Sequence, residues 1–134
     1  MDSSRRASLL LALSLVSCNK PRTAEGAARE FIDRYYIERD HARALEVTEG
    51  GAAERVRAEK KLLEESNATS YGVSPRVFYN LLGQKPNGDR TDLTYQLTVD
   101  SSGVQLKKEV RITVSNLGSG YKVTFFHERD LPAK

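Results

Sequence analysis

Two kinds of hydrophobic spacing divide the chain near residue 70. Before this point apolar residues recur every three or four positions, which predicts helices. The first helix is expected from Ala24, behind an N-cap at Thr23, to about Arg39. Its apolar face comprises Ala24, Ala27, Ala28, Phe31, Ile32, Tyr35 and Tyr36. A short second helix follows Asp40 and is expected to end at Gly50-Gly51. A third is expected from Ala52 to about Glu65, largely exposed because its apolar stripe is thin.

After residue 70 the apolar residues alternate with polar ones, as they do in half-buried strands. The first strand is expected over 77–82 and the second over 93–99, with the Pro86–Asp89 turn between them. The third has an inner face of Leu106, Val110, Ile112 and Val114. The fourth, 121–126, carries aromatic residues on both faces, which suggests that both faces are covered. Turns this short make neighbouring strands antiparallel.

Helices followed by an antiparallel meander indicate an α+β fold. We expect one long helix and two shorter ones to pack on a curved four-stranded antiparallel sheet. At 134 residues the chain has room for one domain. We place that domain at 23–128 and a C-terminal tail at 129–134.

The first 17 residues have the layout of an export signal. Arg5 and Arg6 precede an apolar stretch over 7–16. A helix of that length rises about 15 Å, half the thickness of a bilayer core, and is too short to span it. Ordinary signal peptidases require a small residue at the third position before the cleaved bond. For cleavage before Cys18 that position is Leu15, which is too large.

The string Leu15-Val16-Ser17-Cys18 resembles the lipobox of bacterial lipoproteins. The resemblance implies cleavage between Ser17 and Cys18, and a diacylglycerol on the Cys18 thiol. Residues 18–22 would then be the lipidated cysteine and a short tether. Cys18 is the only cysteine, and lipidation accounts for a lone cysteine in an exported chain. The alternative is a buried N-terminal helix with an incidental cysteine.

The same resemblance implies an address in the bacterial cell envelope. The protein would be a periplasm-facing lipoprotein held to a membrane by its lipid. In Gram-negative lipoproteins an aspartate directly after the lipidated cysteine usually retains the protein in the inner membrane. This chain has Asn19 at that position, which favours the outer membrane.

The net charge of +3 does not indicate a nucleic-acid partner. Removing residues 1–17 takes away two arginines and one aspartate and leaves +2. The chain contains no run of five basic residues, as a nucleic-acid footprint would require. The expected partners are therefore the membrane, through Cys18, and an envelope protein or a small apolar ligand.

The sequence lacks the residue clusters of common catalytic and metal sites. The two histidines, His41 and His127, lie far apart, and the domain has no cysteine. We interpret His41 as a helix-start residue and His127 as a half-exposed residue at a strand end. No metal, cofactor or catalytic residue is expected.

The spaced Ala, Phe and Tyr residues of 24–36, then Asp40 and Ala44-Leu45, then four strands, resemble the nuclear-transport-factor-2-like superfamily. Cystatin-like folds share the pattern. In the superfamily a curved sheet wraps the first helix as a cone and can leave a pocket between them. The resemblance implies a pocket lined by Phe31, Tyr35, Tyr95 and Val110.

Ketosteroid-isomerase-like members of that superfamily use a carboxylate base and a tyrosine donor inside the cone. Tyr35, Tyr36, Tyr79 and Tyr95 are candidate donors, but no inward-facing strand position is expected to carry a carboxylate. We therefore expect a non-enzymatic binding or interaction domain. The alternatives are a pocket for a small apolar ligand and, third in order, an isomerase-like enzyme.

Overall fold

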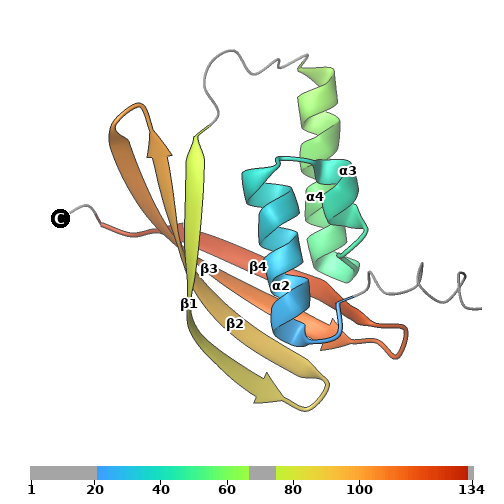
Figure 1. Cartoon of the computed structure of the whole chain (residues 1–134). Helices are drawn as coiled ribbons and strands as arrows, with labels where there is room; N and C mark the ends of the chain where they lie inside the picture. Colours follow the sequence, from blue (N-terminus) through green and yellow to red (C-terminus); the bar gives the residue numbers. More distant parts are fainter. Residues whose placement is uncertain (1–20, 67–74, 133–134) are drawn as a thin grey trace, which may run out of the picture.

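The computed structural model describes residues 21–66 and 75–132. The helical part contains α2 (Ala24–Ile32), the π-helical turn η1 (Asp33–Ile37), α3 (His41–Leu45) and α4 (Gly50–Glu65). The strands are β1 (Arg76–Asn87), β2 (Arg90–Ser101), β3 (Val104–Asn116) and β4 (Tyr121–Asp130). They form one antiparallel sheet in the order β1-β2-β3-β4 (Figure 1). The predicted α+β class, with helices packed on a four-stranded antiparallel sheet, is confirmed.

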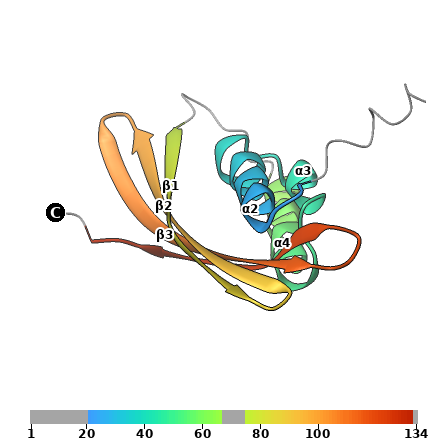
Figure 2. The same ribbon diagram turned by 60° about the horizontal axis from the view of Figure 1, so that its bottom comes forward.

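The sheet is strongly twisted and stays open rather than closing on itself. The helices lie together on its concave face, as Figure 2 shows from below. Near the start of α2, the lower part of the sheet approaches the helices closely. Toward the β2–β3 turn the sheet and the helices diverge (Figures 1 and 2).

The lengths of the helices differ from the prediction. The first helix becomes π-helical after Ile32, where the Glu38 amide donates to the Asp33 carbonyl at 2.8 Å, and it ends before Arg39. The longest of the described helices is α4, with 16 residues. Its first half is buried through Ala52, Ala53 and Val56, so the expectation of a largely exposed helix holds only for its second half.

Gly50 and Gly51 begin α4 instead of ending the second helix. Residues 47–49 run beside β4: the Val123 amide donates to the Val47 carbonyl, and the Glu49 amide donates to the Val123 carbonyl, each at 2.9 Å. This extended segment ends α3 early, at Leu45. Gly50 then turns the chain at a φ of 58°, which glycine adopts without strain.

β1 extends five residues beyond its predicted end at Leu82. A bulge between Leu81 and Gly83 lets pairing with β2 continue to Asn87. Pro86, which cannot donate to a ladder, is tolerated because β1 is an edge strand. The turn itself is Gly88-Asp89.

A bulge in β4 decides which of its side chains face the helices. Val114 pairs with Val123, but Thr113 pairs with Phe125, so Thr124 is an extra residue. From there on Phe126 and Glu128 face the concave side, while Phe125 and His127 face outward. Phe126 is 3% exposed and Phe125 is 56% exposed.

Two expectations about the strands are thereby wrong. β4 is covered on one face only within the described residues, and an inward-facing strand position does carry a carboxylate, that of Glu128. On β3, Leu106 faces the concave side but is 55% exposed, because the helices do not reach that end of the sheet. β4 also continues two residues past the expected domain end, to Asp130.

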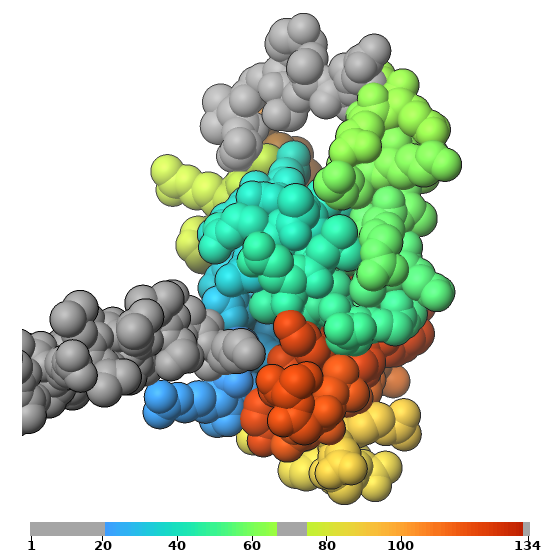
Figure 3. Space-filling model, turned by 90° about the vertical axis from the view of Figure 1, so that its right-hand side faces the viewer, coloured from blue at the N-terminus to red at the C-terminus, as the bar shows by residue number. Residues whose placement is uncertain are grey.

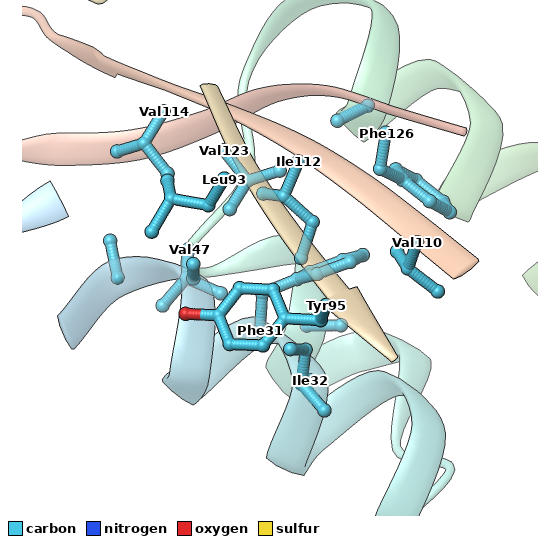
Figure 4. Packing of buried hydrophobic residues seen from close by; sticks show 14 of the residues in the cluster. Phe31, Ile32, Val47, Leu93, Tyr95, Val110, Ile112, Val114, Val123 and Phe126 are labelled. Atoms are coloured by element: carbon cyan, nitrogen blue, oxygen red, sulfur yellow. The ribbon is translucent and has the colours of Figure 1, made fainter. Parts of the chain in front are cut away.

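The core lies between α2, the start of α4 and the middle of the sheet (Figure 4). Its largest fully buried side chains are Tyr95, Phe31, Ile32, Leu93, Leu97 and Ile112. Burial raises the pKa of Tyr95 to about 12. Within the described residues the Tyr95 hydroxyl has no hydrogen-bond partner. The hydroxyl of neighbouring Tyr79, by contrast, donates to Asp33 at 3.0 Å.

Tyr95→Phe is expected to raise the free energy of unfolding by about 1 kcal/mol. The change removes a buried hydroxyl whose desolvation nothing compensates and keeps the ring. Tyr79→Phe is the matched control and should lower it by about 1 kcal/mol, since a made hydrogen bond is lost. Urea titration measures both. If Tyr95→Phe lowered the free energy of unfolding, the Tyr95 hydroxyl would have a hydrogen-bond partner after all.

Candidate functional site

A hollow of about 620 Å³ opens where the helices and the sheet diverge. From the helical side it is bordered by Tyr35, Tyr36, Arg39, His41, Glu59 and Leu63. From the sheet it is bordered by Val77, Val99, Leu106 and Lys108. Figure 3 shows the last turns of α4 (green) extending beyond the other helices at this end of the molecule. The volume lies within the range of roughly 300–1,000 Å³ found for small-molecule sites.

Two tyrosines connect η1 to its neighbours at the hollow. The Tyr35 hydroxyl donates to the Glu59 carboxylate on α4, and the Tyr36 hydroxyl donates to the Glu128 carboxylate on β4. The tyrosine rings meet edge to face at 4.7 Å between centroids. These contacts hold η1, α4 and β4 in fixed relation at the wall of the hollow.

Burial and these carboxylates keep both tyrosines protonated. For Tyr36, burial is the larger cause and the hydrogen bond to Glu128 the second, and together they raise its pKa well above the usual value. The same two causes, with Glu59 as the acceptor, raise the pKa of Tyr35. Neither phenol is set up to release a proton near neutral pH.

Arg55 joins the two carboxylates from the α4 side. Its Nε lies 3.3 Å from Glu59, and a terminal nitrogen lies 3.9 Å from Glu128. Its guanidinium also lies over the Phe126 ring, 4.1 Å from the centroid, and donates to the Phe126 carbonyl at 3.3 Å. Both carboxylates are therefore balanced by a cation within the protein.

The two histidines lie on opposite faces of the sheet. His41 begins α3 behind the Asp40 cap, as predicted, and its Nε2 lies 3.5 Å from Glu59 at the hollow. His127 faces outward on β4, where Glu109 is held by Arg129 at 3.0 Å. That hydrogen bond lowers the pKa of Glu109 and directs its carboxylate to the arginine.

Of the four residues expected to line a pocket, Tyr35 borders the hollow. Phe31, Tyr95 and Val110 are at most 1% exposed and fill the core. Ser17 and Cys18, the expected cleavage and lipidation residues, lie outside the described residues.

The sequence analysis did not predict Glu59, Glu128 or Arg55 as residues of the site. Glu59 and Arg55 are spaced as an ordinary helical ion pair, and only the bulge at Thr124 brings Glu128 inside. The sequence signal that could have suggested this bulge is the adjacent pair Phe125 and Phe126, because one of two neighbouring aromatic residues on a half-covered strand must face away from the core.

The described ranges 21–66 and 75–132 hold no group of three or more His, Cys, Asp or Glu side chains placed to bind a metal ion. Among the helices described, none has the length and apolar character needed to cross a membrane.

Comparison of the chain with protein-family models, curated proteins and solved structures found no match.

Proposed function

We propose that this protein is a lipid-anchored lipoprotein of the bacterial cell envelope whose domain binds a small, largely apolar molecule without transforming it. The observation that carries the binding function is the hollow between the helices and the sheet. Its walls include the apolar side chains of Leu63, Val77, Val99 and Leu106, and one side is formed by hydrogen-bonded polar groups. Apolar walls with few polar groups are typical of ligand sites.

The arrangement of the hollow supports a nuclear-transport-factor-2-like cone. The first helix lies against the concave face of a curved sheet, and the hollow opens between them at one end. We propose membership of that superfamily on this arrangement and on the order of the elements. Fold alone assigns no activity.

The lipid anchor is proposed from the lipobox at Leu15–Cys18. The described chain starts at Pro21, beside the first turn of α2, whereas the hollow is bordered by η1 at the other end of the same helical segment (Figure 1). A lipid on Cys18 would therefore join the domain at the end of the helix opposite the hollow.

The polar side of the hollow supports binding rather than catalysis. An isomerase-like reaction needs a carboxylate free to take a proton and a separate donor free to polarise the substrate. Of the candidate donors, Tyr35 and Tyr36 border the hollow, and each gives its hydrogen to the carboxylate that would act as the base.

Titration with N-phenyl-1-naphthylamine, an uncharged apolar dye that fluoresces on leaving water, tests the binding function. We expect a saturable rise with a Kd of roughly 10–200 μM, from about 0.3–0.4 kcal/mol per heavy atom. The double variant Leu63→Gln/Leu106→Gln changes both walls at exposed positions and should weaken binding about tenfold, as lost apolar contact predicts.

Leu62→Gln/Leu117→Gln is the matched control. Leu62 and Leu117 are similarly exposed and do not border the hollow, so the affinity should stay within about twofold of the wild type. Absence of saturable binding, or equal weakening in both double variants, would refute a ligand site at the hollow.

A further inference from the structure

Building on the proposed function, we infer that the ligand of the hollow is a small apolar acid: a hydrophobic body with one anionic group, held by Lys108 and Arg39. Both cations border the hollow and approach it from opposite layers, Lys108 from β3 and Arg39 from the end of η1. Hydrogen bonds distinguish the polar groups here: Glu59 and Glu128 already accept one within the protein, whereas no described residue accepts one from the side chain of Lys108 or Arg39.

Glu59, which borders the hollow, and Glu128, which contacts Tyr36 and Lys108 of its wall, both have partners within the protein. Glu59 accepts from Tyr35 and lies 3.3 Å from Arg55 and 3.5 Å from His41. Glu128 accepts from Tyr36 and has Lys108 at 3.8 Å and Arg55 at 3.9 Å. A cationic ligand would have to compete with Arg55 for both groups, which disfavours an amine.

Lys108 has donors to spare. Its ammonium forms ion pairs with Glu128 at 3.8 Å and Asp130 at 3.7 Å, but both distances exceed that of a hydrogen bond, and no described residue accepts a hydrogen bond from it. An ammonium group has three donors. Its side chain is 30% exposed, so an anion at this site would be only partly solvated.

Arg39 is the other cation that borders the hollow. Within residues 21–66 and 75–132 its guanidinium forms no ion pair, unlike those of Arg34, Arg43 and Arg55. Its backbone is left-handed, with a φ of 55°, and its side chain is exposed at the edge of the hollow.

The apolar residues lie close to Lys108 along the sheet. Leu106 is on the same face of β3, two residues before it, and Val99 pairs with Leu106 across the β2–β3 ladder. A molecule with its anionic group at Lys108 would therefore lay its hydrophobic body on Leu106 and Val99. Charge and apolar surface are arranged for one amphipathic ligand.

Two dyes that differ by one charge test the inference. 8-Anilinonaphthalene-1-sulfonate is N-phenyl-1-naphthylamine with a sulfonate added. The wild type should bind the anionic dye about fivefold more tightly at low salt, and 0.5 M NaCl should remove most of that preference. Lys108→Met should lose about fivefold in affinity for the sulfonate dye and less than twofold for the neutral one.

Lys107→Met is the control, since Lys107 is the adjacent residue on the opposite face of β3 and should leave both affinities unchanged. Arg39→Met, on the other layer, repeats the test independently. Circular dichroism establishes that each variant is folded.

The outcomes separate the two proposals. If the neutral dye binds at the hollow but the sulfonate adds nothing, or Lys107→Met and Lys108→Met lose equally, the acid ligand is wrong and the apolar site stands. If neither dye gives saturable binding, the proposed function fails as well. Selective loss of the sulfonate dye in Lys108→Met and Arg39→Met supports the inference.

Discussion

Phe126→Ala is expected to lower the free energy of unfolding by about 3–5 kcal/mol, a large fraction of the roughly 5–15 kcal/mol that stabilises a typical domain. The Phe126 ring is buried against Phe31, with 4.8 Å between centroids, and against Tyr35 at 5.2 Å. Arg55 lies over its face. The substitution removes the ring, leaves a cavity and takes away the surface on which Arg55 rests. Urea or thermal unfolding followed by circular dichroism measures the loss.

Phe125→Ala is the matched control and tests the bulge directly. The residues are adjacent and identical in kind, but Phe125 points to solvent, and its removal should change stability by at most about 0.5 kcal/mol. Without the extra residue at Thr124, Phe125 and His127 would face the core, and the two effects would be exchanged. Equal losses in the two variants would contradict the register of β4.

Cys18→Ser is expected to abolish membrane attachment. Two acyl chains hold a protein stably on a bilayer at about 0.8 kcal/mol per buried methylene, and no described helix could replace them as a span. Bacterial cells that express the wild type and are fed an alkyne fatty acid should yield a labelled protein in the membrane fraction. The variant should carry no label and should be absent from the membrane fraction.

The double variant Cys18→Ser/Lys20→Cys serves as the control for this experiment. It keeps one cysteine in the chain but moves the thiol out of the string that begins at Leu15, so it should also remain unlabelled. Labelling of Cys18→Ser at the wild-type level would rule out the anchor. Labelling of the double variant would show that a thiol alone, rather than its place in the lipobox, is sufficient.

The sequence determined the elements whose signal is local. The N-caps Thr23 and Asp40, the three helical segments, the four strands and their antiparallel order follow from spacing and turn residues within a few positions. The buried set of α2 and the inner face of β3 at Val110, Ile112 and Val114 were also predicted, because β3 is half-buried there and its apolar and polar residues alternate.

The tertiary structure alone decided the features of the site. The segment at 47–49 pairs with β4 and makes Gly50 a helix start. The bulge at Thr124 reverses the faces of β4 and brings Glu128 to Tyr36. A one-residue shift moves every later side chain to the other face, and nothing in the alternation before it announces the shift. Nor does spacing reveal where two layers diverge: Leu106 has the pattern of a core residue, and it lines a hollow because the helices end before they reach it.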